Sequence, residues 1–192
     1  MKSGRKLYIL CGGQSRRMGR DKAMVELRGE RLLDRQINKG ENYFDEVVLL
    51  CGQNSYPVEN RQLTDRVENA GPLSGILEAL KDGAENSLKE IAILPVDLPG
   101  ISEDTIQQLA LSKLNESDQA LLIKSGEDLQ PLAGVYSVDL ASELEHFLKI
   151  GNRMVFAFVN GLEYSVIEVG QEELKNLNQP DDVRWFEKRD MN

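Results

Sequence analysis

Short apolar runs alternate with helix-forming patterns along this chain of 192 residues, and the alternation limits the folds that it can adopt. The apolar runs are Lys6–Leu10, Glu46–Leu50, Ile91–Leu94, Ala120–Ile123 and Tyr164–Val169. Several are continuously apolar, which suits strands covered on both faces, as in a parallel sheet. Amphipathic helices are predicted to begin at Leu32, at Pro72 and after the N-cap Ser102, and to span Val138–Ile150 and Pro180–Lys188. The pattern predicts a single α/β domain over residues 1–192, Rossmann-like, with a mostly parallel, doubly wound sheet.

This fold class predicts where functional residues lie. In open α/β sheets, ligands bind outside the carboxyl ends of the strands. We therefore expect functional side chains directly after the apolar runs, and several motifs occupy that position.

The charge of the chain is unevenly distributed. The net charge is −9, yet residues 1–39 hold 11 basic and 4 acidic side chains and carry +7, whereas the rest of the chain carries −16. This distribution favours a localised anion-binding site and argues against a broad nucleic-acid surface, so no nucleic-acid partner is predicted. Four of the N-terminal cations are expected to be solvated, on or near the first predicted helix: Arg28, Arg31, Arg35 and Lys39.

The composition points to a protein of the cytoplasm. No apolar run approaches the ~18 residues of a membrane helix, and the N-terminal apolar stretch is too short for the core of a signal peptide. The two cysteines, Cys11 and Cys51, each follow an apolar run and are interpreted as reduced core thiols. Because the sequence has one histidine, His146, a structural zinc site is excluded. We therefore predict a cytoplasmic protein with no membrane partner.

A glycine-rich, basic segment follows the first predicted strand. Residues 10–22 run Leu-Cys-Gly-Gly-Gln-Ser-Arg-Arg-Met-Gly-Arg-Asp-Lys, with three glycines and four cations. Glycines let backbone N–H groups approach a ligand, and successive N–H groups form an anion-binding nest to which Arg17 and Lys22 add full charges. The segment is neither a Walker loop nor a G-x-G-x-x-G dinucleotide fingerprint. A mobile basic surface loop is the simpler alternative, but the position after the strand favours an anion site.

The same segment resembles the signature loop of the molybdenum cofactor guanylyltransferases, which are nucleotidyltransferases with a Rossmann-like, glycosyltransferase-A-type fold. The matching residues are Leu10-Cys11-Gly12-Gly13, Ser15, Arg17-Met18-Gly19 and Asp21-Lys22, with Cys11 where the family usually has alanine. The resemblance implies that this loop wraps the triphosphate of GTP, with Arg17 and Lys22 as catalytic residues on phosphate oxygens. The residues that it places alongside the nucleotide are Leu10, Cys11, Gly12 and Gly13.

A second segment, Gly71-Pro72-Leu73-Ser74-Gly75-Ile76, is similar to the family's Gly-Pro-Leu-x-Gly-Ile segment. From the residues alone it predicts a proline-started helix, in which Gly71 and Gly75 allow a ring to approach the backbone. The resemblance places guanine near Gly71, with an acidic residue just upstream accepting from guanine N1–H and N2–H₂. Asp65 and Glu68 are both candidates. We favour Asp65, because aspartate is the usual family residue, although the spacing leaves Glu68 open.

A single carboxylate, Asp97, stands between Pro95 and Pro99 after the third predicted strand. A lone aspartate there is commonly a helix cap, but Ser102 is available for that role, and the two prolines rigidify the segment. Because Mg²⁺ binds through one or two carboxylates plus substrate phosphates, one well-placed aspartate suffices. The segment resembles the family's Pro-Cys-Asp-x-Pro motif, with Val96 replacing the cysteine. The resemblance implies that Asp97 holds the metal, contacts the nucleotide and takes part in catalysis.

Two later segments extend the resemblance. Gln130-Pro131-Leu132 is similar to a family segment before the last large helix, although a strand with a proline at its start explains it equally well. The run Asn176-Leu177-Asn178-Gln179-Pro180-Asp181-Asp182 is similar to the family's Asn-x-Asn-x-Pro-x-Asp motif. The resemblance makes Asn176 and Asn178 acceptor-binding candidates, and a looser match adds Arg153.

These matches predict transfer of GMP from GTP to the terminal phosphate of molybdenum-molybdopterin, with Mg²⁺ as cofactor and release of diphosphate. Proteins that deliver or receive the molybdenum cofactor are candidate partners. Three alternatives remain open. One is a sister nucleotidyltransferase, such as a cytidylyltransferase acting on molybdopterin or a sugar-phosphate enzyme. Another is a non-catalytic nucleotide-binding module. The third, a bare adaptor domain, is disfavoured because it would not need four cations in one glycine-rich loop.

Overall fold

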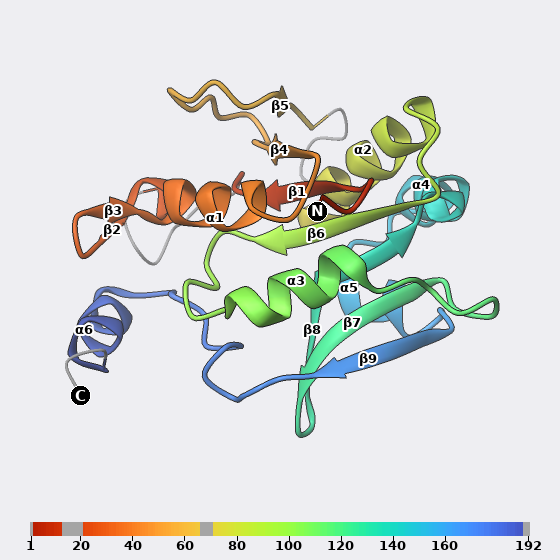
Figure 1. The fold of residues 1–192 in the computed structure, drawn as a ribbon. Coiled ribbons are helices and arrows are strands. Elements are labelled where there is room, and N and C mark those ends of the chain that lie inside the picture. Colours follow the sequence, from red (N-terminus) through yellow and green to blue (C-terminus); the bar gives the residue numbers. More distant parts are fainter. Residues whose placement is uncertain (1, 13–20, 66–70, 190–192) are drawn as a thin grey trace.

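The structure, a computed structural model, describes residues 2–12, 21–65 and 71–189 and is built on a seven-stranded sheet (Figure 1). The strands are β1 (Lys6–Leu10), β4 (Glu46–Leu50), β5 (Gln62–Leu63), β6 (Glu90–Pro95), β7 (Ala120–Ser125), β8 (Asp128–Ser137) and β9 (Tyr164–Glu168). Their order is β5-β4-β1-β6-β8-β7-β9, and β8 runs antiparallel to both neighbours while the other pairs are parallel. A separate hairpin joins β2 (Glu26–Leu27) to β3 (Glu30–Arg31). The predicted mostly parallel α/β fold is confirmed.

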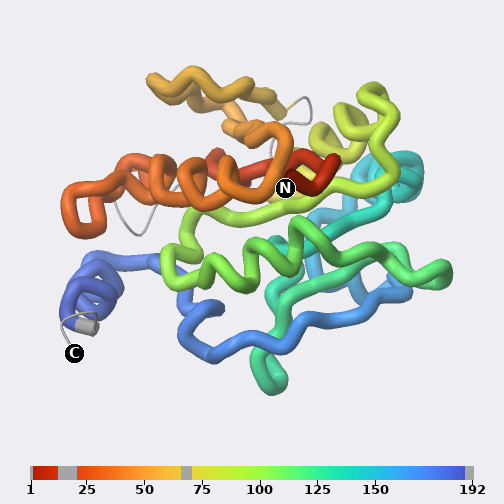
Figure 2. The backbone as a smooth tube through the Cα atoms, in the orientation of Figure 1, coloured from red at the N-terminus to blue at the C-terminus, as the bar shows by residue number. Residues whose placement is uncertain are grey.

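Helices cover both faces of the sheet, as a doubly wound fold requires (Figures 1 and 2). They are α1 (Leu32–Glu41), α2 (Pro72–Glu85), α3 (Glu103–Leu111), α4 (Ala141–Lys149), α5 (Val155–Val159) and α6 (Pro180–Arg189), with 3₁₀ turns η1 (Lys22–Met24) and η2 (Val138–Leu140). Helices α1 and α3 contact each other on one face of the sheet, and α2 packs with α4 on the other.

Alternate residues of β1 face two separate cores. Leu7 and Ile9 belong to the apolar cluster beneath α1 and α3, whereas Tyr8 belongs to the cluster beneath α2 and α4. Each of these three side chains is at most 1% exposed. Burial on both faces explains why this strand is continuously apolar in the sequence.

The five predicted strands are present, with ends displaced by two residues at most. Strand β5 was not predicted, and β8 was considered only as one of two equal explanations of the Gln130-Pro131-Leu132 segment. In β8, Pro131 and Gly134 interrupt the apolar pattern that marks the other strands. Gly134 is needed because a Cβ there would lie 2.4 Å from the carbonyl oxygen of Leu121. The Gln130-Pro131-Leu132 segment thus lies in a strand, as that alternative required, but Pro131 is the fourth residue of β8 and not its first.

The prediction of a single α-helix over Val138–Ile150 is wrong for its first three residues. The chain first forms the 3₁₀ turn η2, and the α-helix begins only at Ala141. The Ser137 side chain accepts a hydrogen bond from Asp139 N at 3.3 Å, which caps the 3₁₀ turn. A local side-chain cap of this kind competes with continuous α-helix.

The carboxyl ends of β1, β4 and β6 lie at one edge of the sheet, because these strands are parallel neighbours. The C-terminal segment returns to the same edge, where Leu177 N donates to the carbonyl of Asp97 at 2.8 Å. Helix α6 then lies against β2 (Figure 1). Within the described part of the chain, no helix has the length and apolar character needed to cross a membrane.

Candidate active site

A cavity of about 700 Å³ opens at the carboxyl ends of β1, β4 and β6. Its lining residues are Leu10, Cys11, Gly12, Lys22, Gly52, Gln53, Asn54, Asp65, Gly71, Pro72, Pro95, Val96, Asp97 and Leu132. The position is the one expected for a ligand site in an open α/β sheet.

This cavity brings together seven residues that the sequence predicted for the nucleotide site, although they come from segments up to 87 positions apart. They are Leu10, Cys11, Gly12, Lys22, Asp65, Gly71 and Asp97. Three further candidates, Gly13, Arg17 and Glu68, lie outside the described residues. Their roles stay predictions.

Gly12 is required at the rim of this cavity by the close approach of two chain segments. A Cβ atom at Gly12 would lie 2.3 Å from the backbone carbonyl carbon of Cys51. The N–H groups of Cys11 and Gly12 both donate to the carbonyl of Leu50, at 3.1 and 2.8 Å. The segments that leave β1 and β4 are therefore in backbone contact beside the cavity.

Lys22 enters the cavity from η1, a turn that is anchored at its start. Asp21 caps this turn, with Oδ1 accepting from Ala23 N at 3.0 Å. Its Oδ2 atom accepts from the Tyr56 hydroxyl at 2.8 Å and from Asn54 Nδ2 at 3.1 Å. These bonds tie the turn to the loop after β4 and so fix the base of the Lys22 side chain.

The Lys22 ammonium connects three segments of the chain. Its Nζ donates to Asp97 Oδ2 at 2.7 Å and to Asn178 Oδ1 at 2.5 Å. The Lys22 and Asp97 side chains are 20% and 22% exposed, so the pair borders the cavity and is not sealed in the core. A cation able to bind phosphate oxygens thus stands beside a carboxylate able to bind a metal ion.

The loop that carries Asp97 is held by side chains of α1. Gln36 Nε2, fully buried, donates to the carbonyl of Leu98 at 2.7 Å. Lys39 Nζ donates to the carbonyl of Pro99 at 3.2 Å and to the carbonyl two residues later at 2.6 Å. The backbone around Asp97 is therefore fixed from the side of the sheet that carries α1.

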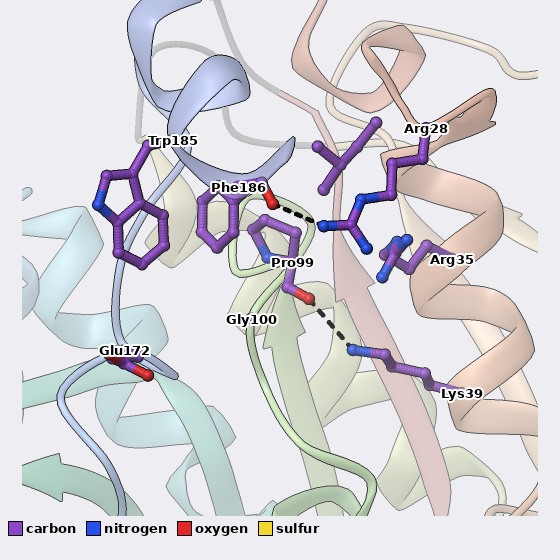
Figure 3. A pocket seen from close by; sticks show the side chains of 9 residues that line it. Arg28, Arg35, Lys39, Pro99, Gly100, Glu172, Trp185 and Phe186 are labelled. Carbon is purple, nitrogen blue, oxygen red and sulfur yellow. Dashed lines mark hydrogen bonds between the residues drawn. The ribbon is translucent and has the colours of Figure 1, made fainter. Parts of the chain in front are cut away.

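The expectation that the cations of α1 are solvated is wrong for Lys39. Burial, followed by the charge of the neighbouring Arg35, lowers the pKa of Lys39 to about 8. Figure 3 shows Arg28, Arg35 and Lys39 facing Pro99 and Phe186. They line a separate cavity of about 320 Å³ between α1, the Pro99 loop and α6. The segments that cover Lys39 are distant in the sequence, so the pattern of α1 gave no sign of them.

Asp65 and Gly71 face the cavity from opposite ends of a segment that is only partly described. Gly71 has φ +63° and ψ −154° and precedes Pro72 at the start of α2, a backbone conformation that favours glycine. Burial, together with the nearby Glu78 carboxylate, raises the pKa of Asp65. A desolvated carboxylate of this kind is a strong acceptor for a ligand that offers N–H donors.

The oxygens of Asp97 suit Mg²⁺. Lys22 occupies Oδ2, and none of the described residues donates a hydrogen bond to Oδ1. The described ranges contain no group of three or more His, Cys, Asp or Glu side chains that could hold a metal alone. Mg²⁺ commonly uses one or two carboxylates, water and substrate phosphates, so this donor set fits the ion when a triphosphate is bound.

Of the acceptor candidates, Asn178 is part of the site and Asn176 lies beside it. The N–H groups of Asn178 and Gln179 donate to Asp182 Oδ2 at 2.8 and 2.9 Å, which fixes the turn before α6. Asn176 lines a second cavity, of about 530 Å³, together with Lys175, Gln130 and other residues of β8 and the C-terminal segment.

Arg153 lies in the connection between α4 and α5. Its Nη1 donates to the carbonyls of Leu148 and Asn152, both at 2.7 Å. It lines neither the cavity of Asp97 nor that of Asn176. Its proposed contact with an acceptor stays a prediction.

Residues 7–164 match the model of the family described as MobA-like NTP transferase domain. The chain belongs to this family. The "Probable molybdenum cofactor guanylyltransferase" of Opitutus terrae is 32% identical over 180 residues, covering 92% of this chain and 85% of that protein. The "Molybdenum cofactor guanylyltransferase" of Vibrio atlanticus is 30% identical and covers 93% of each chain.

Solved structures agree with the fold of this MobA-like domain. The molybdopterin-guanine dinucleotide biosynthesis protein A of Archaeoglobus fulgidus superposes with a TM-score of 0.77 at 23% identity, covering 95% of this chain and 97% of that one. A protein of Aquifex aeolicus also gives a TM-score of 0.77, at 24% identity, covering 92% of this chain and 95% of that one. The likeness supports the nucleotidyltransferase fold of the MobA-like domain.

Sequence reasoning missed one wall of the site in this MobA-like domain. Gly52, Gln53 and Asn54 line the cavity directly after β4. The rule that functional residues follow apolar runs applies to the second predicted strand as well, and it would have found this Cys-Gly-Gln-Asn segment. The role of Asn54 in holding Asp21 depends on a contact across 33 positions, for which the sequence offers no signal.

Proposed function

We propose that this MobA-like domain transfers GMP from GTP to the terminal phosphate of molybdenum-molybdopterin and releases diphosphate. The observation that carries the proposal is the cavity in which Lys22 and Asp97 meet beside Gly12 and Gly71. The names of the relatives, at up to 32% identity over most of the chain, support the same nucleotide and acceptor.

The reaction needs alignment and charge stabilisation more than acid–base chemistry. An oxygen of the acceptor phosphate attacks the α-phosphorus of GTP, a new P–O bond forms, and the bond to the α–β bridging oxygen breaks, so that diphosphate leaves. The acceptor phosphate is anionic at neutral pH and needs no general base. The demand on the protein is to hold two polyanions in line and to neutralise their charge.

Lys22 is the described side chain best suited to that neutralisation. Its contact with Asp97 shows that a charged oxygen can lie 2.7 Å from Nζ, and a phosphate oxygen would take a similar position. Arg17 is expected to assist from the part of the loop outside the described residues. When bound at Asp97, Mg²⁺ supplies further positive charge to the triphosphate oxygens.

Selection of guanine is assigned to Asp65. A carboxylate can accept from guanine N1–H and N2–H₂ together, a donor pair that the other common bases lack. The position of Asp65 in the wall that also holds Gly71 supports this assignment, because the space beside Gly71 is open: a Cβ there would meet no atom of the described residues within 4 Å.

The acceptor is expected to approach from the C-terminal side of the site. Asn178 contacts Lys22, and the neighbouring cavity of about 530 Å³ is lined by Asn176 and Lys175. A cytoplasmic location and proteins that deliver or receive the molybdenum cofactor belong to the same proposal.

The proposal is tested by incubating the full chain with a nucleoside triphosphate, Mg²⁺ and molybdenum-molybdopterin and measuring the diphosphate released. GTP should support turnover, whereas CTP, ATP and UTP should not. Preference for CTP would indicate the sister cytidylyltransferase, and turnover with a sugar phosphate in place of molybdopterin would indicate that other acceptor class. Stabilisation by GTP without diphosphate release would identify a non-catalytic binding module and contradict the proposal.

A further inference from the structure

Two thiols that the proposed reaction does not use face each other in the wall of the nucleotide cavity. Cys11 follows β1 and Cys51 follows β4, and their Sγ atoms are 3.9 Å apart. Cys11 is 5% exposed and lines the cavity, whereas Cys51 is fully buried behind it. Both are free thiols.

The backbone spacing at the two cysteines is compatible with a disulfide. The preceding residues, Leu10 and Leu50, are paired in parallel register, so the cysteines occupy matching positions just past the ends of adjacent strands. Neighbouring strands lie roughly 4.8 Å apart, within the range of about 4.4–6.8 Å between Cα atoms of a disulfide. The sulfur atoms must approach by about 1.9 Å to reach the S–S distance of about 2.05 Å.

That approach has to come from the side chains, because the backbones cannot move closer. The position where a Gly12 Cβ would stand is 2.3 Å from Cys51 C, so the two segments are already in contact. Rotation of the thiols would end two hydrogen bonds, from Cys11 Sγ to the Leu50 carbonyl at 3.4 Å and from Cys51 Sγ to Gln62 Oε1 at 3.3 Å.

The hydrogen bond between Cys51 and Gln62 belongs to a network that reaches the nucleotide cavity. Gln62 Oε1 also accepts from Tyr56 N at 2.9 Å, and Gln62 Nε2 donates to Tyr56 O at 2.8 Å. The Tyr56 hydroxyl contacts Asp21 Oδ2, and Asp21 caps the turn that begins with Lys22. A change at Cys51 is thereby connected to the cation of the nucleotide site through a chain of direct contacts.

We propose that Cys11 and Cys51 are a redox-active pair whose reversible disulfide weakens nucleotide binding in the adjacent cavity. The second half of this proposal rests on the proposed function, because it takes GTP as the ligand. The oxidant class is a small peroxide, which can enter the cavity and reach Cys11.

The chemistry balances with hydrogen peroxide as the two-electron oxidant. The Cys11 thiolate attacks one peroxide oxygen, the O–O bond breaks, and a sulfenic acid and hydroxide result, the latter taking the thiol proton to become water. Cys51 sulfur then attacks the sulfenic sulfur, the S–S bond forms, the S–O bond breaks, and a second water leaves. The hydrogen bond with Cys51 and burial raise the pKa of Cys11, which makes the first step slow.

The decisive experiment exposes the full, reduced chain to hydrogen peroxide under native conditions, alkylates the remaining thiols and maps the peptides by mass spectrometry. The expected result is a linked Cys11–Cys51 peptide, lighter by two hydrogen atoms and restored by dithiothreitol. Two thiols that stay alkylatable, or a peroxide product confined to one cysteine, would overturn the proposal.

The predicted effect of the disulfide on nucleotide binding is tested by measuring the Kd for GTP before and after oxidation. We expect the Kd of the wild type to rise roughly tenfold or more after oxidation. The same treatment of Cys11→Ala, which cannot form the bond, should leave that variant's own Kd unchanged within a factor of about two. If the protein with the Cys11–Cys51 disulfide binds GTP with the same Kd as the reduced protein, the proposed effect of the disulfide on nucleotide binding is contradicted. If the reduced chain binds no GTP, the proposed function fails, while the linked peptide still decides whether the pair is redox-active.

GTP should also slow formation of the bond, since the nucleotide is expected to lie alongside Cys11. This protection is measured as the rate at which the linked peptide appears with and without GTP and Mg²⁺. Cys51→Ala, with Cys11 left to react alone, is the matched control: its rate reports whether GTP shields the Cys11 thiol itself. Equal rates with and without GTP in both proteins would place the nucleotide away from this wall.

Discussion

Lys22 Nζ donates to Asp97 Oδ2 at 2.7 Å, and this bond joins the glycine-rich segment after β1 to the proline-rich segment after β6. The two residues are 75 positions apart and meet because β1 and β6 are adjacent parallel strands that end at the same edge of the sheet. Asn178 accepts from the same ammonium, so the C-terminal segment is part of the arrangement. The site is thus organised around one cation that three distant segments share.

Removing the Lys22 ammonium should slow the reaction strongly and leave the fold intact. Lys22→Ala is expected to lower kcat by about 10²–10³-fold, the range seen when one charge-stabilising donor is lost. Diphosphate release with saturating GTP and acceptor measures the effect. Lys149→Ala, at a side chain that is 69% exposed, is the matched control and should retain wild-type kcat. Full activity in Lys22→Ala would remove Lys22 from the catalytic group.

Asp97→Asn should weaken Mg²⁺ binding, since the amide keeps the shape of the carboxylate but not its charge. We expect the Mg²⁺ concentration for half-maximal diphosphate release to rise at least roughly tenfold, with no comparable change for the exposed control Asp181→Asn. Far-UV circular dichroism should show the same secondary structure in all three proteins. An unchanged Mg²⁺ dependence would show that another group holds the ion.

The sequence predicted five of the seven strands of the sheet and most residues of the candidate nucleotide site for one physical reason. A strand buried on both faces leaves a continuous apolar run, and a parallel sheet gathers the ends of such runs at one edge. Gly12, Lys22 and Asp97 could therefore be assigned to one site without knowledge of their contacts. The resemblance to the family then indicated what each of these residues would bind: the nucleotide for Gly12, phosphate oxygens for Lys22 and Mg²⁺ for Asp97.

The features that the sequence did not predict depend on contacts between distant segments. Strand β8 lacks a clean apolar run because Gly134 must admit the carbonyl of Leu121. Lys39 was expected in solvent, yet its ammonium binds carbonyls of the loop after Asp97 and lines a cavity that α6 also borders, and neither segment is visible in the pattern of α1. The contact of Asn178 with Lys22 spans 156 positions.

Gly12→Ala should destabilise the fold beside the nucleotide site. The added methyl group would lie 2.3 Å from the backbone of Cys51 and Gly52, which cannot move as a flexible side chain could. Overpacking of this kind costs about 1–3 kcal/mol of unfolding free energy, measurable by urea denaturation. Gly170→Ala is the control, because the nearest atom to its Cβ would be 3.9 Å away. Equal midpoints for the two variants would contradict the close approach.

The pair of Asp82 and Arg61 should make stability depend on pH in the acid range. Both Asp82 oxygens accept from Arg61 at 2.6 Å, and these bonds lower the pKa of Asp82 despite its burial. The contribution to stability is therefore present above the unfolded pKa of about 3.9 and is lost as the pH falls through the lower folded value.

Asp82→Asn is expected to cost about 2 kcal/mol at pH 7, less than for a fully buried pair because Arg61 is 38% exposed. The difference from the wild type should shrink as urea unfolding is repeated at successively lower pH. The exposed Asp181→Asn variant should show neither effect. A difference that stays constant down to the acid limit would mean that lost packing, and not the ion pair, is responsible.

Asp65→Asn should relax the choice of base, because the amide replaces one accepting oxygen with an NH₂ donor, which cannot accept from guanine N1–H or N2–H₂ as the second carboxylate oxygen does. We expect its Kd for GTP to rise by roughly tenfold to a hundredfold, and its preference for GTP over inosine triphosphate, which lacks the 2-amino group, to fall.

Burial and the Glu78 carboxylate raise the pKa of Asp65, so the affinity of the wild type for GTP should be constant above that pKa and decline as the pH falls through it. Calorimetric titrations with both nucleotides across the acid range test these points, with the exposed Asp45→Asn as control. If Asp65→Asn keeps the wild-type ratio between the two nucleotides, another acidic residue selects guanine, and Glu68 is then the candidate to test.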